Sequence, residues 1–420
     1  MLVSGEQRQE LAAYFGQTEY LDLVRLARKA DRAAAKDAQP HVFVIPGILG
    51  SQLGIARPPP LPNDVLWLDP IDIQVGRLGL LGLDAGAPIV PLGAVLYSHL
   101  KLRLRLRAAG FAVTLHDYDW RLGIEESGAA LAERLRQHGS RRLAIVAHSM
   151  GGLISRAALG LRGTRHVERV VLLGTPNSGS FAPVQALRGT YAVVRKVARL
   201  DGATTAERLT EEVFNSFPSL YQMIPVSTRK RAADLLDPRA WPDSGPALRP
   251  PLLDRARRFR DSLPSPDDRF ISVAGVGQET VTALSKGRDG FVYTITRCGD
   301  GTVPTDSAAL DGTTTYFTHT AHSDLTRDAL VASAIIDLLR NGSTDRLPTR
   351  WASNSRAEAR VSDRQLRRAH TEKVDWASLT PAQRRDFLQS LNDPLKVRLR
   401  VPASRRRGSS RAARATRIRS

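Results

Sequence analysis

The stretch AIVAHSMGGLISR, residues 144–156, places a serine between an apolar run and the start of a helical pattern. The run LAIVAH has the short, β-branched composition of a buried strand, and residues 153–161 have helical spacing. A strand that turns sharply into a helix exposes the residue at the turn, and small neighbours let the backbone fold tightly around it. We therefore interpret Ala147 to Gly151 as a nucleophile turn with Ser149 at its tip. Its first small residue is alanine rather than the usual glycine.

Strand-like and helix-like segments alternate on both sides of this turn. Strands are expected at 41–47, 111–120 (with its following loop), 143–148 and 167–173, and helices at 92–109, 124–138 and 153–161. The strand pattern lapses over 176–265 and returns with FISVAGVG, FVYTITRCG and TTYFTHTAH before a helix at 324–340. Such alternation predicts an α/β protein with a mostly parallel central sheet and helices on both faces. The helical insertion at about 176–265 is expected to be a cap over the site.

The ends of the chain differ from its centre. Residues 1–38 are expected to form an N-terminal helical segment, and 39–342 the main domain. Residues 343–420 are expected to be a basic appendage, with a polar linker, a helix at 380–391 and a disordered tail. That tail, VPASRRRGSSRAARATRIRS, holds seven arginines and no acidic residue.

The composition limits the class of protein. The chain has 420 residues, 42% of them hydrophobic, and a formal net charge of +19. Its one cysteine, Cys298, excludes an internal disulfide framework. We see no secretory signal and no apolar stretch of membrane-spanning length, and expect a cytoplasmic protein, with export without a signal or a peripheral membrane location as alternatives. The positive charge suggests that the tail binds an anionic membrane surface, but a coding bias toward arginine also explains the charge. We do not expect nucleic acid as a partner. The oligomeric state is open.

A serine nucleophile needs a base and an orienting acid. For a strand-turn-helix nucleophile the chain order is serine, then aspartate or glutamate, then histidine. Asp300, between two glycines after a predicted strand, is the expected acid, and Asp306 is the fallback. His322 follows the next strand and is the expected base, with His319 as its competitor. We interpret the remaining nearby histidine, His148, as a packed or hydrogen-bonding residue.

Two backbone amides are expected to form an oxyanion hole. The N–H of Met150 opens the helix after the nucleophile, where the helix dipole favours negative charge. The second donor is expected from VIPGILGS, residues 44–51, with Ile48 as first choice and Leu49 as second. The chain has no metal-ligand spacing, phosphate loop or nicotinamide fingerprint, so neither a metal nor a cofactor is expected.

Taken together, seven stretches over about residues 40–340 resemble the lecithin:cholesterol acyltransferase-like branch of the α/β-hydrolases, and so the lipases. In order they are VIPGILGSQL (44–53), HDYDWR (116–121), AHSMGGL (147–153), LLGTPNSGS (172–180), NSFPSLYQMIP (215–225), GDGTVP (299–304) and AHSDL (321–325). The resemblance implies an α/β-hydrolase fold, with Ser149 as nucleophile, Asp300 as acid and His322 as base. It also implies hydrolysis or transfer of acyl esters on lipids. It says nothing about residues 343–420.

The cap agrees with a lipid substrate. Apolar side chains gather at the predicted site entrance: Phe214, Phe217, Leu220, Tyr221, Met223 and Ile224, with Trp67 and residues 78–83 nearby. We take Leu49, Trp67, Phe217 and Tyr221 as the candidate substrate-binding residues. The alternative is that the cap residues only pack a small core of their own.

Three hypotheses of function follow. The first is a serine esterase that hydrolyses acyl lipids, a phospholipase A or lipase, through an acyl-enzyme; with an acceptor alcohol in place of water it becomes a lipid O-acyltransferase. The second is a non-catalytic hydrolase-fold interaction module whose basic tail binds nucleic acid or a membrane. The third joins them: residues 343–420 recruit the enzyme to a membrane or a delivery apparatus.

Overall fold

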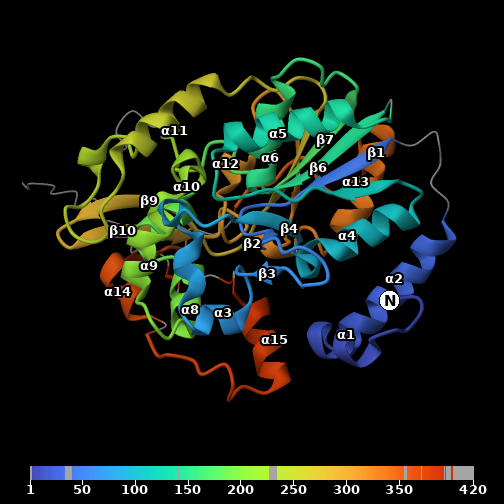
Figure 1. Ribbon diagram of the computed structural model, residues 1–420. Helices are drawn as coiled ribbons and strands as arrows, with labels where there is room; N and C mark the ends of the chain where they lie inside the picture. The colour runs from blue at the N-terminus through green and yellow to red at the C-terminus, as the bar shows by residue number, and fades with distance from the viewer. Residues whose placement is uncertain are drawn as a thin grey trace, which may run out of the picture.

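The computed structural model describes residues 2–33, 40–140, 142–226, 234–353, 357–369, 371–391, 393 and 399–400. Its centre is a six-stranded sheet in the order β11-β8-β7-β6-β1-β5, with every neighbouring pair parallel (Figure 1). The strands are β1 (His41–Ile45), β5 (Val113–Leu115), β6 (Leu143–His148), β7 (Val167–Leu173), β8 (Phe270–Gly275) and β11 (Thr314–Thr318). The predicted α/β-hydrolase fold, with its parallel central sheet, is confirmed.

Helices cover both faces of this sheet. On one face lie α5 (Ile124–Gln137) and α6 (Met150–Leu159), and on the other α4 (Leu96–Ala108) and α13 (Ala329–Asn341). Within β1, Phe43 packs with the first pair of helices and Val42 with the second, because successive side chains of a strand point to opposite faces. This two-sided burial explains why the strands are apolar along their whole length.

Two small antiparallel sheets flank the centre. One has the order β3-β2-β4 and the other β12-β10-β9. Their strands are β2 (Ser51–Ile55), β3 (Asp64–Val65), β4 (Val90–Ala94), β9 (Thr280–Gly287), β10 (Gly290–Thr296) and β12 (Ala359–Ser362). FVYTITRCG forms the expected strand, β10, which pairs in the second small sheet rather than in the central one. One expectation was wrong here. Residues 92–94, expected to be helix, are strand, since Pro91 and Gly93 disfavour helix.

The insertion between β7 and β8 is helical, as expected. The described residues between 176 and 265 form no strand; their elements are α7 (Phe181–Leu187), α8 (Ala192–Leu200), α9 (Ala206–Glu212), η3 (Phe214–Ser216), α10 (Pro218–Gln222), η4 (Pro238–Ala240) and α11 (Pro250–Ser262). Short helices precede it at α3 (Pro70–Gln74), η1 (Arg77–Leu81) and η2 (Leu83–Ala85).

The helix expected at 324–340 begins only at α13, because Asp328 caps its first turn. The short helices α12 (Thr305–Ala308) and η5 (His322–Asp324) precede it.

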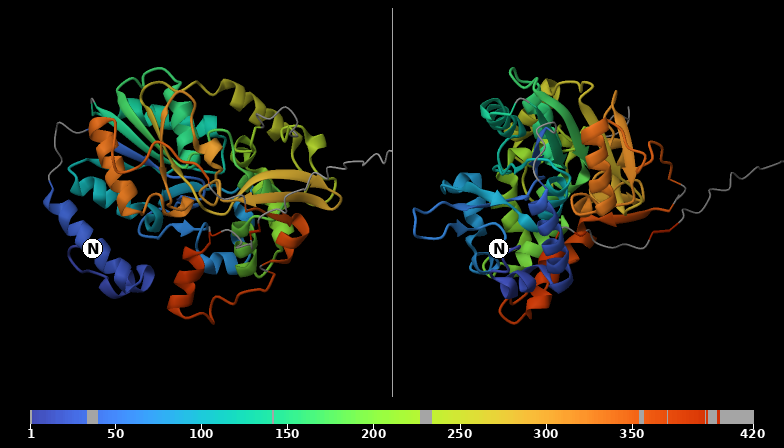
Figure 2. Two further views of the ribbon diagram at one scale, coloured as in Figure 1. Left: turned by 180° about the vertical axis from the view of Figure 1, so that it is seen from behind. Right: turned by 90° about the vertical axis from the view of Figure 1, so that its right-hand side faces the viewer.

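Helices from the first and last described parts of the chain meet beside the domain. The N-terminal helices are α1 (Arg8–Phe15) and α2 (Gln17–Arg32), and the C-terminal ones α14 (Asp363–Arg368) and α15 (Pro381–Gln389), which matches the helix expected at 380–391. Arg385 of α15 donates a hydrogen bond of 3.3 Å to the carbonyl of Ala13, and the red helix α15 lies beside the dark-blue helix α1 in Figure 2. None of the described helices is long and apolar enough to cross a bilayer. The basic tail, 401–420, lies outside the described residues.

Candidate active site

Ser149 occupies the sharp turn between β6 and α6. Its backbone has φ 54° and ψ −126°, a strained conformation for a residue with a side chain. A Cβ on Gly151 would lie 2.4 Å from the carbonyl oxygen of Pro46, and one on Gly152 would lie 1.9 Å from Oγ1 of Thr175. The two glycines therefore let α6 begin directly against the loops that follow β1 and β7.

The structure brings the three predicted residues into one hydrogen-bonded chain. Oγ of Ser149 lies 3.0 Å from Nε2 of His322, and Nδ1 of His322 lies 2.7 Å from Oδ2 of Asp300. The carboxylate is buried, and its other oxygen accepts the amides of Thr302 (2.9 Å) and Val303 (2.7 Å). A carboxylate accepts, so Nδ1 of His322 carries a proton and Nε2 is free to accept from the serine hydroxyl.

Asp300 reaches this chain from an unexpected direction. Asp300 follows β10, which lies outside the main sheet. It is nevertheless packed against the end of β8, because a Cβ added to Gly275 would lie 2.6 Å from the Cβ of Asp300. A Cβ on Gly174, at the end of β7, would lie 2.9 Å from Oδ2 of Asp300 and 3.0 Å from Nδ1 of His322. Glycines at two strand ends thus leave the room that the imidazole and carboxylate occupy.

The competing candidates lie outside the chain of hydrogen bonds. Asp306 is exposed on α12, and His319 is exposed after β11, three residues before His322. Neither contacts Ser149 through a hydrogen bond among the described residues. Among those same residues, no group of three His, Cys, Asp or Glu side chains is placed to hold a metal ion.

The turn after β1 lies against the nucleophile. A Cβ on Gly47 would lie 2.8 Å from Cβ of Ser149, and the amide of Gly50 closes the turn on the carbonyl of Gly47 at 3.1 Å. Within the described part of the chain, the amides of Ile48 and Met150 donate no hydrogen bond to another residue. Two free donors therefore lie close to the serine, one in the residue that follows it and one in the turn whose Gly47 packs against it.

A cavity of about 1260 Å³ opens onto Ser149 and His322. Its walls are largely apolar and include Leu49, Trp67, Trp120, Val193, Val194, Phe214, Phe217, Leu220 and Met223. Its volume exceeds the roughly 300–1,000 Å³ of pockets for drug-sized ligands. Both chain ends also line it, through Tyr14, Trp376 and Leu388, which the sequence did not indicate.

Three of the four candidate substrate-binding residues, Leu49, Trp67 and Phe217, line this cavity, and the fourth does not. Tyr221 is fully buried and does not border the cavity. Its hydroxyl donates to the carbonyl of Asn215 and accepts the amide of Arg249, both at 3.2 Å. Tyr221 therefore packs the cap, and its assignment to the substrate site was wrong.

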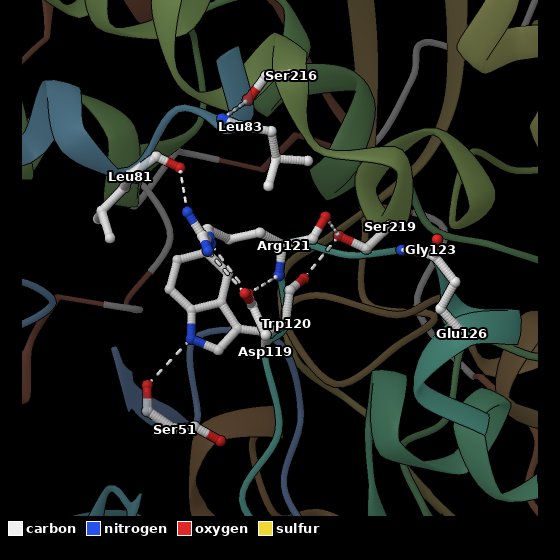
Figure 3. Close-up of polar contacts among 10 residues, drawn as sticks. All are labelled: Ser51, Leu81, Leu83, Asp119, Trp120, Arg121, Gly123, Glu126, Ser216 and Ser219. Carbon is white, nitrogen blue, oxygen red and sulfur yellow. Dashed lines mark hydrogen bonds and ion pairs between the residues drawn. The ribbon is translucent and has the colours of Figure 1, made fainter. Parts of the chain in front are cut away.

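The motif HDYDWR supports one cavity wall (Figure 3). The guanidinium of Arg121 is buried, binds both carboxylate oxygens of Asp119 and donates to the carbonyl of Leu81 at 3.0 Å. Nε1 of Trp120 donates to the carbonyl of Ser51 at 3.0 Å, and Ser219 of the cap donates to the carbonyl of Trp120 at 2.7 Å. This network joins the loop after β5 to η1, β2 and α10. The sequence singled out the motif but not this role.

Comparisons with known proteins agree with the fold class. A family model described as a PGAP1-like alpha/beta domain matches residues 130–227, less than half of the chain. A comparison with curated proteins finds no match. We therefore describe the chain as having an α/β-hydrolase fold that is similar, in its central part, to the PGAP1-like domain.

Among solved structures, the mature lipase BlEst2 of Bacillus licheniformis aligns with 73% of this chain and 94% of its own, at 16% identity and a TM-score of 0.40. In a Tle4–Tli4 complex, a chain aligned over its full length covers 74% of this one, at 14% identity and a TM-score of 0.45. The lin2722 product of Listeria innocua likewise aligns over its full length with 74% of this chain, at 13% identity and a TM-score of 0.31. All are distant similarities, and the fold assignment rests on the sheet described above.

Proposed function

We propose that this protein is a serine esterase that cleaves acyl esters of lipids through an acyl-enzyme. The observation that carries the proposal is the Ser149–His322–Asp300 chain at the opening of a large apolar cavity. A nucleophile, its base and the acid that orients the base are the parts that acyl transfer needs.

In the proposed reaction, Oγ of Ser149 attacks the ester carbonyl while Nε2 of His322 takes the hydroxyl proton. Asp300 holds the resulting imidazolium, and the amides of Ile48 and Met150 donate to the oxyanion. When the tetrahedral intermediate collapses, the C–O bond breaks and His322 gives its proton to the leaving alcohol. Water, activated by His322, then releases the fatty acid from Ser149.

The apolar walls favour a substrate with an acyl chain. Phe217, Leu220 and Met223, at three-residue spacing in α10 and the residues that flank it, line the cavity and provide apolar surface near the nucleophile. The motifs shared with the acyltransferase-like branch favour a phospholipase A or lipase. An acceptor alcohol that enters in place of water would make the same site a lipid O-acyltransferase.

The test compares Ser149→Ala with Ser262→Ala, a matched change whose hydroxyl binds the carbonyl of Phe259 at the end of α11, away from the site. With a medium-chain p-nitrophenyl ester, Ser149→Ala is expected to lose activity to background while Ser262→Ala retains it. Circular dichroism checks that both fold. Mass spectrometry of products from mixed phospholipid vesicles then separates hydrolysis from transfer. Full turnover in folded Ser149→Ala would overturn the proposal.

A further inference from the structure

The residue before the nucleophile makes a contact that the mechanism above does not use. Nε2 of His148 lies 3.0 Å from the backbone carbonyl oxygen of His322. Because a carbonyl oxygen only accepts, this nitrogen carries the hydrogen and donates it. His148 therefore has no free Nε2 lone pair and cannot replace His322 as the base.

This contact completes a closed set of hydrogen bonds around His322. Two consecutive residues of the nucleophile turn bind the side chain and the backbone of His322. Ser149 hydrogen-bonds to Nε2 of the ring, and His148 hydrogen-bonds to the backbone carbonyl. Asp300 holds the other side, through Nδ1 of the ring at 2.7 Å and through the backbone amide, which donates to the Asp300 carbonyl at 2.8 Å. Because His148 and Ser149 are adjacent in the chain, a hydrogen bond from His148 to the His322 backbone also fixes the distance between Ser149 and the His322 ring.

His322 needs such support because its local structure is short. It begins η5, a three-residue turn between β11 and α13, so no long element fixes its carbonyl. The rings of His148 and His322 are also in contact, with centroids 4.7 Å apart and planes tilted by 42°. Burial, together with the nearby His322 and His99, lowers the pKa of His148 well below its ordinary value. A neutral His148 does not repel the imidazolium that forms at His322 during the reaction.

We infer that His148 is a positioning residue that holds His322 in line with Ser149 by donating a hydrogen bond to its backbone. The inference rests on the proposed function, since it assigns a role within the same triad. It goes beyond packing, because it requires the N–H donor and not only the bulk of the ring.

The test compares three variants. His148→Leu removes the donor, His148→Gln keeps an N–H donor, and His166→Leu is the matched control. His166 makes the same kind of contact, 3.0 Å from the carbonyl of Leu135, but precedes β7 at the opposite end of the sheet. We expect kcat for the p-nitrophenyl ester to fall about 10–100-fold in His148→Leu with KM nearly unchanged, since a small misplacement costs up to about 10²-fold. His148→Gln is expected to recover most of that loss, and His166→Leu to match wild type.

Wild-type kcat in His148→Leu, or equal loss in the leucine and glutamine variants, would overturn the inference. Should His148→Leu fail to fold, nitrogen NMR of the wild-type protein decides: the neutral tautomer protonated at Nε2 of His148 supports it, and any other form contradicts it. The rate at which an alkyl fluorophosphonate modifies Ser149 separates this inference from the proposed function. If the wild-type protein reacts with the phosphonate but cleaves no lipid ester, the proposed lipid esterase function is wrong. The order of the modification rates of Ser149 in the three variants still tests the role of His148.

Discussion

At the scale of single residues, Asp300 has the most constrained surroundings in the site. Its carboxylate is buried and accepts three hydrogen bonds, two from backbone amides and one from His322. The amides fix the orientation of the carboxylate, so the oxygen that faces His322 selects one tautomer of the ring. Its contribution is therefore expected to depend on charge and acceptor capacity rather than on size.

Asp300→Asn keeps the size of the side chain but not the charge. Aspartate-to-asparagine changes at this position of a catalytic triad cost about 10⁴-fold in kcat, because the wrong tautomer is held. We expect a loss of that order for Asp300→Asn, measured as steady-state turnover of an ester. Asp306→Asn, the exposed alternative, is expected to retain wild-type turnover; the reverse ranking would reassign the acid.

Short motifs made most of these residues predictable, because a strand, a tight turn and a reactive side chain lie together in sequence. Ser149, Asp300 and His322 could be selected in this way. The contact of His148 with His322 joins residues 174 positions apart, and no local pattern indicates it. Tyr221 was misassigned for a related reason: an apolar helix shows its aromatic residues in sequence but not which side faces a cavity.

At the scale of elements, the C-terminal segment is built into the fold. β12 pairs with β10, and Asp363 at the start of α14 is fully buried. Its carboxylate accepts the amide of Phe291 (3.1 Å), the hydroxyl of Tyr293 (2.8 Å) and Nε of Arg188 (3.0 Å). The ion pair thus joins α14 to the hairpin of β9 and β10 and to the end of α7.

Asp363→Ala removes the only carboxylate that is paired with the buried Arg188 among the described residues. An unpaired buried charge typically costs about 3–5 kcal/mol, so we expect a loss of that size in the free energy of unfolding, measured in urea. Asp345→Ala, an exposed carboxylate in the linker, is expected to change it by less than about 0.5 kcal/mol. Equal stability of the two variants would show that the segment does not support the domain.

The sequence did not indicate this arrangement, because β12 reaches its partner across more than sixty residues. It also missed β9, whose side chains are mostly only half-buried and give a weak pattern. Parallel strands of the main sheet were easier to predict, since burial on both faces makes each one a continuous apolar run.

At the scale of the whole molecule, several histidines are kept neutral by the fold. Burial lowers the pKa of His41, His99 and His116 to about 4, and it also lowers the pKa of His148 well below its ordinary value. In the unfolded chain these groups titrate near pH 6.5. Between about pH 6.5 and pH 4 the unfolded state therefore binds more protons than the folded state, and stability must fall as the pH falls.

We expect the free energy of unfolding to drop from pH 7 to pH 5, by up to about 1.4 kcal/mol per pH unit for each histidine that stays neutral in the fold. Urea unfolding at pH 7, 6 and 5 measures the slope. His99→Leu removes one of these groups and is expected to give a shallower slope than wild type. Stability that is constant or rises over this range would contradict the burial of these histidines.

The cavity is likewise a property of the whole chain. Its walls come from the loops after β1 and β5, from the cap and from the terminal helices α1 and α15. The sequence indicated an apolar cap near the nucleophile, but the terminal helices were placed outside the domain. Their place at the cavity depends on tertiary contacts, such as that of Arg385 with Ala13, which no composition or spacing reveals.

The most direct test of the account is mass spectrometry of the intact, folded protein after exposure to an alkyl fluorophosphonate. The account predicts one covalent adduct per chain, located on Ser149 after proteolysis, and a much slower reaction in His322→Ala. No adduct on folded wild-type protein, or modification of a different residue at an equal rate in His322→Ala, would contradict it.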